Sequence, residues 1–66
     1  MPKEFDNKPL SRTEATLAAD YLKHKGKTLN SGWISLWKKR PSEIAQDYNT
    51  PVLSILGAIR RIPVAV

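Results

Sequence analysis

Three prolines limit how long any helix in the second half of the chain can be. Proline lacks an amide hydrogen and clashes with the preceding turn, so a helix accepts it at its first position but not in its interior. The prolines are Pro41, Pro51 and Pro63. They divide this half into residues 41–50 and 51–62, and each segment predicts one short helix that begins at its proline.

The apolar residues in both segments have helical spacing. Ile44, Ala45 and Tyr48 share one face of the first segment. Asn49 tolerates the left-handed conformation that ends many helices, and Thr50 is a suitable N-cap for the next helix. In the second segment the spacing continues through Val52, Ile55, Leu56 and Ile59. We therefore expect a tight turn near Asn49 and a last helix over about 51–62.

The first half of the chain predicts one longer helix. Ser11 and Glu14 have the spacing of a capping box, in which each side chain accepts a hydrogen bond from the other residue's amide. Gly26 is suited to the position just past a helix end. We expect a helix over about 12–25. Residues 1–10 are interpreted as a flexible N-terminal arm, and residues 11–66 as a single domain.

Residues 33–37, Trp-Ile-Ser-Leu-Trp, are rich in aromatic and β-branched side chains. They favour a short strand, with a short helix as the alternative, because an apolar run this brief does not determine its own period. Residues 64–66 would pair with this strand in a two-stranded ribbon. Trp33 and Trp37 are interpreted as core residues, with stacking on bases or on a partner as the alternative use.

These patterns together predict a mainly α fold with three helices, and a small β-ribbon is compatible with it. A chain of 66 residues buries only a modest core, so we expect nearly every large apolar side chain at helical spacing to contribute. The expected core residues are Leu17, Tyr21, Leu22, Trp33, Ile34, Leu36, Ile44, Ala45, Tyr48, Ile55 and Ile59.

Positive charge is concentrated in two stretches. The formal net charge is +5, and residues 21–40 contain six lysines and arginines but no acid. Residues 48–66 carry Arg60 and Arg61, again without an acid. Basic clusters favour an anionic partner such as nucleic acid. The alternatives are a solvated surface and, for Arg60 and Arg61, simple complementarity to a helix dipole.

Several other classes of protein lack support in the sequence. The chain has no cysteine and one histidine, His24, so we expect no disulfide and no metal site. No phosphate-binding loop and no paired nucleophile and base are present, so we expect neither an enzyme nor a cofactor. The first ten residues do not form an apolar signal segment, and no apolar run is long enough to cross a membrane. We expect a cytoplasmic protein associated with the nucleoid.

Residues 44–59 carry a resemblance to a known family. A small residue, Ala45, stands where two crossing helices approach, Asn49 stands at the turn, and Ile55 faces back from the second helix. This arrangement resembles the helix-turn-helix of Cro-type phage repressors and many bacterial regulators. Residues 42–45, Ser-Glu-Ile-Ala, also resemble winged-helix regulators. The resemblance implies that the last helix lies in the DNA major groove and that residues 41–44 meet the backbone.

The resemblance implies base-reading positions at Pro51, Val52, Leu53, Leu56, Gly57 and Arg60. Only Arg60 among them carries good hydrogen-bond donors for base edges, so we expect phosphate contacts to dominate. The expected nucleic-acid-binding residues are Lys38, Lys39, Arg40, Ser42, Thr50, Leu53, Ser54, Gly57, Arg60 and Arg61.

The expected partner is double-stranded DNA, bound by a transcriptional regulator. We expect a homodimer, because one small module offers little interface. The alternative is a small phage-type inhibitor or adaptor that docks on a host protein through the apolar face of the last helix. In that case Leu53 and Leu56, if exposed, would mark the protein interface.

Overall fold

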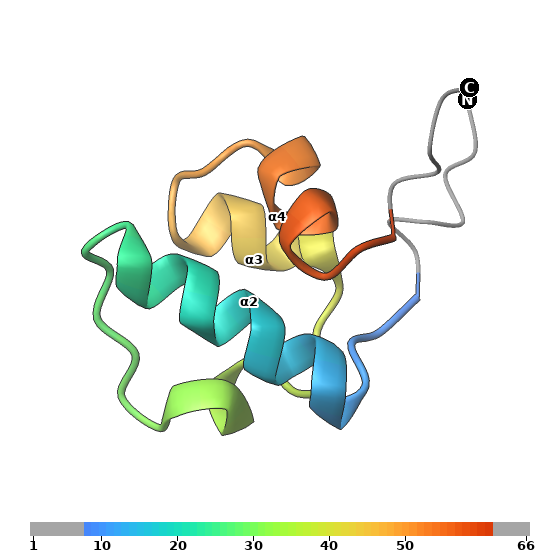
Figure 1. The fold of residues 1–66 in the computed structure, drawn as a ribbon, viewed down its shortest axis with the longest axis horizontal. Helices are drawn as coiled ribbons and strands as arrows, with labels where there is room; N and C mark the ends of the chain where they lie inside the picture. Colours follow the sequence, from blue (N-terminus) through green and yellow to red (C-terminus); the bar gives the residue numbers. More distant parts are fainter. Residues whose placement is uncertain (1–7, 62–66) are drawn as a thin grey trace.

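The computed structural model describes residues 8–61, and within this range the protein is all helical. The elements in order are α2 (Arg12–His24), the short 3₁₀ helix η1 (Gly32–Ser35), α3 (Pro41–Asp47) and α4 (Val52–Ala58). Helix α2 lies between η1 on one side and the α3–α4 pair on the other (Figure 1). The expectation of a mainly α fold with three helices is confirmed.

Helix α2 begins as the sequence predicts. The Glu14 amide donates to Ser11 Oγ over 3.2 Å, and the Ser11 amide donates to Glu14 Oε1 over 3.0 Å. Both halves of the capping box are therefore formed, and they satisfy backbone donors that the first turn leaves unpaired.

All three α-helices end with the same hydrogen-bonded turn. In each, the amide two residues past the C-cap donates over 2.9 Å to a carbonyl five residues earlier. The pairs are Lys27 to Leu22, Thr50 to Ala45, and Arg61 to Leu56. One residue of each turn adopts the left-handed conformation. These residues are Gly26 (φ 82°) after α2, Asn49 (φ 55°) after α3 and Arg60 (φ 62°) after α4. The first two were expected, but an arginine carries no sequence signal for this conformation.

The strand expected at residues 33–37 is wrong. This segment contains η1, in which the Leu36 amide donates to the Trp33 carbonyl over 3.0 Å and Ser35 Oγ donates to the Gly32 carbonyl over 2.8 Å. The backbone groups thus find partners within the segment itself, which is the alternative that the sequence left open. No strand occurs in residues 8–61, and the proposed pairing segment 64–66 lies outside the described range.

The expected bounds of the last helix are also wrong. Its N-cap is Pro51, not Thr50, and it ends at Ala58 instead of Ile62, which lies outside the described residues. The Thr50 amide closes the end of α3, and its hydroxyl makes no hydrogen bond to the first turn of α4. At the other end, the left-handed turn at Arg60 reverses the chain and directs Arg61 back toward α2. Tertiary contacts here override the local helical pattern.

The core is smaller in volume than expected. Its buried residues are Leu10, Ala15, Ala18, Ala19, Leu22, Leu36, Ile44, Ala45, Ile55, Leu56 and Ile59. Leu17, Tyr21, Trp33 and Tyr48 are only partly buried against them. Ile34 is 57% exposed, so its assignment to the core is wrong, and Trp37 is 39% exposed. The 3₁₀ turn explains this, because alternate residues of such a turn do not share faces as they do in a strand.

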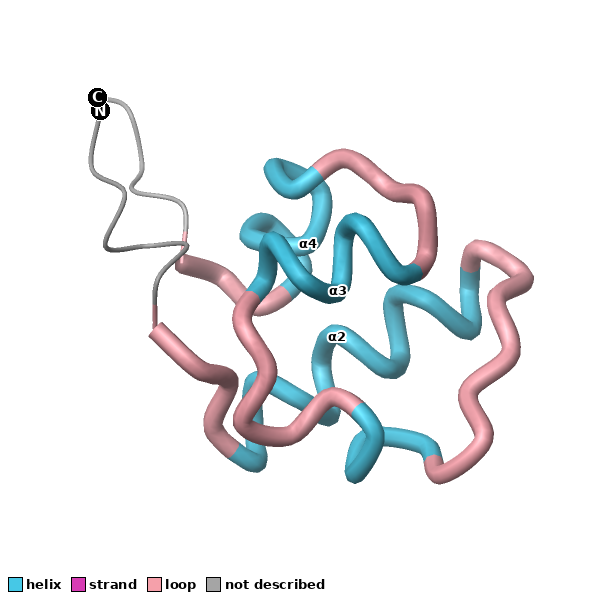
Figure 2. Tube along the Cα trace, turned by 180° about the vertical axis from the view of Figure 1, so that it is seen from behind, coloured by secondary structure: helices cyan, strands magenta, loops and turns pink. Residues whose placement is uncertain are grey.

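The packed domain begins before residue 11. Leu10 is 2% exposed, its amide donates to the Lys39 carbonyl over 2.8 Å, and its carbonyl accepts from the Lys38 amide over 3.1 Å. The loops that carry these residues therefore run together, and Figure 2 shows the loop before α2 beside the loop that leads into α3. Of the expected arm, residues 8–10 belong to the domain, and residues 1–7 lie outside the described range.

Thr50 provides a test of the packing at the α3–α4 turn. Its Oγ1 atom is buried and makes no hydrogen bond within the described residues. A buried hydroxyl without a partner costs about 1–3 kcal/mol, so Thr50→Val should raise the free energy of unfolding by about 1 kcal/mol. Urea unfolding measures this, with Thr28→Val at an exposed loop position as the control. A loss of stability in Thr50→Val alone would show that the hydroxyl has a partner.

Candidate nucleic-acid interface

The turn between α3 and α4 consists of four residues, 48–51, and it places the two seven-residue helices against each other. Ile44, Ala45 and Ile55 are all buried in the common core, as the sequence predicts. Leu53 and Gly57 are exposed on α4, and Leu53 is 64% exposed. The accessible face of α4 is therefore largely apolar and uncharged.

The hydroxyl side chains that were expected at the nucleic acid in this region differ in their exposure. Ser42 is exposed at the start of α3, and Ser54 is half-buried in α4. The buried Thr50 hydroxyl faces the protein interior. Ser42 is thus the only hydroxyl of these three on a fully exposed residue.

Arg61 is held inside the protein. Its Nε donates to Glu14 Oε2 over 2.7 Å and its Nη2 to Glu14 Oε1, so that the guanidinium binds both carboxylate oxygens. Its Nη1 also donates to the Lys8 carbonyl over 2.6 Å, and Nη2 donates to the Pro9 carbonyl over 2.8 Å. The Arg61 and Glu14 side chains are only 11% and 23% exposed. Arg61 was expected at the nucleic acid, but in the structure it joins distant parts of the chain.

This ion pair changes the acidity of Glu14. The hydrogen bonds from Arg61 lower the pKa of the Glu14 carboxyl below its usual value; partial burial opposes the change, and the hydrogen bond from the Ser11 amide adds to the lowering. Glu14 therefore stays ionised at any pH near neutrality and keeps both the ion pair and the cap of α2.

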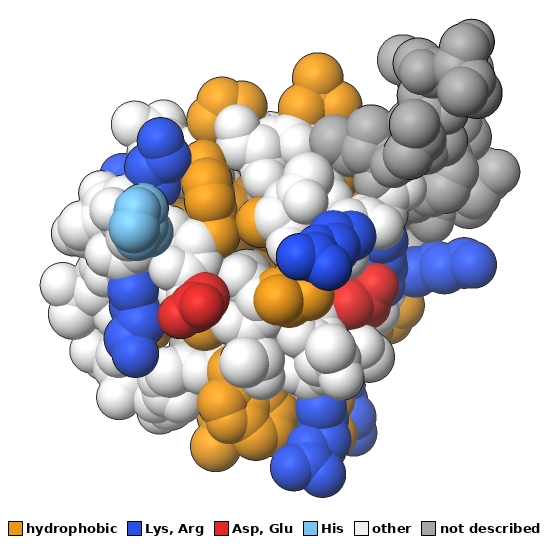
Figure 3. All heavy atoms as spheres, in the orientation of Figure 1, with side chains coloured by type: hydrophobic (Ala, Val, Ile, Leu, Met, Phe, Trp, Pro, Cys, Tyr) orange, Lys and Arg blue, Asp and Glu red, His pale blue; other side chains and the backbone are white. Residues whose placement is uncertain are grey.

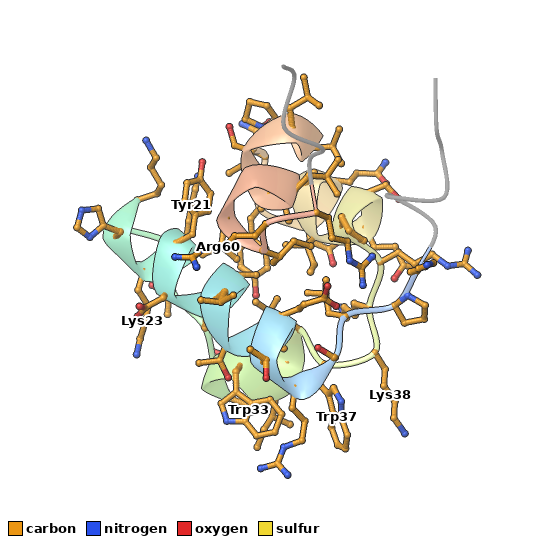
Figure 4. All side chains as sticks on the ribbon, turned by 45° about the vertical axis from the view of Figure 1, so that its right-hand side comes forward. Tyr21, Lys23, Trp33, Trp37, Lys38 and Arg60 are labelled. Carbon is orange, nitrogen blue, oxygen red and sulfur yellow. The ribbon has the colours of Figure 1, made fainter. Side chains whose placement is uncertain are left out.

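The remaining expected cations do not form one cluster. Lys39 Nζ lies 3.3 Å from Asp47 Oδ2 in an exposed ion pair. Lys38 Nζ lies over the Trp37 ring, 4.8 Å from its centroid. Figure 4 shows Lys38 at the end of the molecule that carries both tryptophans, whereas Arg60 lies on the side of Tyr21. The structure thus separates Arg60 from Lys38.

Two arginines remain accessible beside the α3–α4 pair. Arg40 immediately precedes α3 and Arg60 follows α4, and both residues are exposed. Neither side chain makes an ion pair within residues 8–61. These two are therefore the best placed of the expected phosphate-binding residues.

A second group of side chains was not predicted as one site, although Lys38 was expected at the nucleic acid and stacking was the alternative use of Trp33 and Trp37. Trp33 and Trp37 pack edge to face, with ring centroids 5.7 Å apart and an interplanar angle of 61°. The guanidinium carbon of Arg12 lies 5.4 Å from the Trp33 ring centroid. We call Arg12, Trp33, Trp37 and Lys38 the tryptophan face. Arg12 was missed because only the folding of η1 against α2 brings it over Trp33.

The structure gives no basis for a metal site in the part of the chain that it describes. No three histidine or carboxylate side chains come together there, and His24 is exposed on α2. None of the described helices has both the length and the apolar character needed to cross a bilayer. Comparisons with protein-family models, with curated proteins and with solved structures found no match to this chain.

The Glu14–Arg61 pair predicts a specific loss of stability in acid. A carboxyl whose pKa is lower in the folded protein stabilises it fully above the unfolded pKa, about 4.3, and this contribution disappears as the pH falls through the folded value. Glu14→Gln should therefore be less stable than the unmodified protein at pH 7, and the difference should shrink toward pH 3. Urea unfolding between pH 3 and pH 7 measures it.

Glu43→Gln is the matched control, because Glu43 occupies the same position in the first turn of α3 and accepts from the Arg40 amide, but makes no ion pair with a guanidinium group. It should leave most of the acid-dependent loss in place. If Glu14→Gln showed the full acid-dependent loss, the Arg61 contact would not form in solution.

Proposed function

We propose that this protein is a small DNA-binding domain that docks on duplex DNA with the α3–α4 pair. The observation that carries the proposal is the arrangement of these two helices. They are short, they are joined by a tight turn with Asn49 in the left-handed conformation, and Ala45 and Ile55 lie in the same core. Two short helices joined by a tight turn are typical of helix-turn-helix domains, which present their second helix to a groove.

Charge supports the same proposal. The net charge is +5, and Arg40 before α3 and Arg60 after α4 are exposed and make no ion pair among the described residues. Exposed cations at such positions can bind phosphates on either side of a groove.

The side chains of α4 define what kind of binding to expect. Leu53 and Gly57 offer no hydrogen bonds to base edges, and Leu53 can contact only the methyl group of thymine. The proposed function is therefore attachment to the DNA backbone with little discrimination between sequences, rather than recognition of one operator.

The salt dependence of binding tests the role of the arginines. Each phosphate contact contributes about −0.9 to the slope of log affinity against log salt concentration. Arg40→Gln and Arg60→Gln should each weaken binding to a random labelled duplex and make this slope shallower by about 1. Fluorescence anisotropy across a salt series measures both effects.

Lys23→Gln is the control, because Lys23 lies on α2 and points away from α4 (Figure 4). It should change the slope little. Absence of binding at low salt, or equal slopes in all variants, would refute the proposed function.

The exposure of Leu53 favours a second candidate function, docking of α4 on a protein partner. Leu53→Lys distinguishes the two candidates. If α4 faces DNA, a new cation there should tighten duplex binding and steepen the salt slope by about 1. If α4 docks on a protein, the same change should abolish the association by placing a charge in an apolar contact. Duplex binding that does not change in Leu53→Lys would argue against contact between α4 and DNA.

A further inference from the structure

The tryptophan face lies apart from the α3–α4 surface. Figure 4 shows Trp33, Trp37 and Lys38 at one end of the molecule and α4 at the other. In the same region, Figure 3 shows hydrophobic and cationic side chains next to each other along the edge where η1 lies. Both tryptophans of the chain belong to this face. The contacts proposed between α4 and a duplex do not involve the tryptophan face.

The aromatic rings of this face are accessible rather than packed away. Trp37 is 39% exposed, Trp33 is half-buried, and the neighbouring Ile34 is 57% exposed. Because the two rings meet at 61°, their faces point in different directions. Two planar groups that stacked on them would have to be splayed apart, as successive bases of an unpaired strand are and as the bases of a duplex are not.

The charges of the face complement a phosphate backbone. Arg12 lies over Trp33 and Lys38 lies over Trp37, so each indole has a cation beside it. A base that stacks on an indole displaces the cation from the ring face, and the displaced cation can then bind the phosphate of the same nucleotide. The four side chains of the tryptophan face carry two positive charges and no negative one.

A hollow beside Trp33 offers polar contacts as well. It has a volume of about 370 Å³ and is lined by Arg12, Thr13, Thr16 and Trp33. Thr13 and Thr16 are exposed on α2, and no acidic residue contributes to this lining. The combination of an aromatic wall, hydroxyl groups and a guanidinium fits the face, the edge and the phosphate of a nucleotide better than an apolar peptide side chain.

We propose that the tryptophan face binds single-stranded nucleic acid, with the indoles of Trp33 and Trp37 stacking on unpaired bases and with Arg12 and Lys38 binding the adjacent phosphates. This site is separate from the duplex-binding surface, so either proposal can fail without the other. A protein with both would hold a duplex at one end and an unpaired strand at the other.

Tryptophan fluorescence reports directly on this site, because the chain has no other tryptophan. Oligothymidylate of about ten nucleotides, a length in the range covered by one small domain, should quench the emission at low salt. Trp33→Phe and Trp37→Phe each leave a single tryptophan, and the tryptophan emission of both variants should still be quenched. Trp37→Ala should weaken binding roughly tenfold, as loss of one stacked base requires, and Trp37→Phe should restore most of it.

The cations are tested by the salt dependence of the same titration. Arg12→Gln and Lys38→Gln should each make the slope shallower by about 0.7, the value for a phosphate contact in a single strand. Lys23→Gln, which belongs to neither proposed surface, should leave the slope unchanged. Duplex binding by Trp37→Ala should equal that of the unmodified protein, which separates this proposal from the preceding one. Circular dichroism verifies that each variant is folded.

Four results would overturn the proposal. They are the absence of quenching by oligothymidylate at low salt, equal affinity in Trp37→Ala, quenching by vesicles of anionic lipid but not by the oligonucleotide, and a change in emission with protein concentration alone. The third would identify the face as a membrane contact, and the last would identify it as a contact between two copies of the chain.

Discussion

Arg61 ties the end of the described chain to residues 8–14, which lie about fifty residues earlier in the sequence. It holds both oxygens of Glu14 in the first turn of α2 and the carbonyls of Lys8 and Pro9 in the loop before that helix. The composition of the core explains why these contacts of Arg61 matter. Four of its eleven buried residues are alanines, which let helices approach closely but bury little apolar surface. The paired and hydrogen-bonded Arg61 side chain at the edge of this small core therefore contributes much of the interaction that joins the two ends of the domain.

The contacts of Arg61 also explain why α4 ends at Ala58. A helix that continued to residue 62 would carry Arg61 around another turn and away from Glu14. Instead the chain adopts the left-handed conformation at Arg60, although this costs an L-amino acid about 1–2 kcal/mol. Buried Ile59 and the bidentate contact of Arg61 offset that cost. The fold thus places one of two adjacent arginines inside and leaves the other exposed, and the local sequence does not distinguish them.

Features decided by neighbouring residues were predictable from the sequence. The Ser11–Glu14 cap, the turn at Gly26, the start of α3 at Pro41 and the turn at Asn49 depend on residues at most a few positions apart. Features decided by distant contacts were not. The segment after Gly32 became a 3₁₀ helix against α2, Leu10 joined the core by pairing with residues 38 and 39, and the cations separated into different surroundings. Apolar and charge patterns indicate which residues are buried or basic, but they do not assign their partners.

The separation of the cations determines how the net charge of the protein can be used. Arg61 serves the fold, and Lys39 is paired with Asp47, whereas Arg12 and Lys38 lie against indole rings. Cations that rest on aromatic rings keep their charge and gain a defined position, because the ring attracts them without neutralising them. Lysines and arginines elsewhere on the surface contribute mainly to the long-range positive field of the protein. Arg12 and Lys38 instead have defined positions relative to the indoles, so the long-range field and the local placement of charge arise from different side chains of the same basic domain.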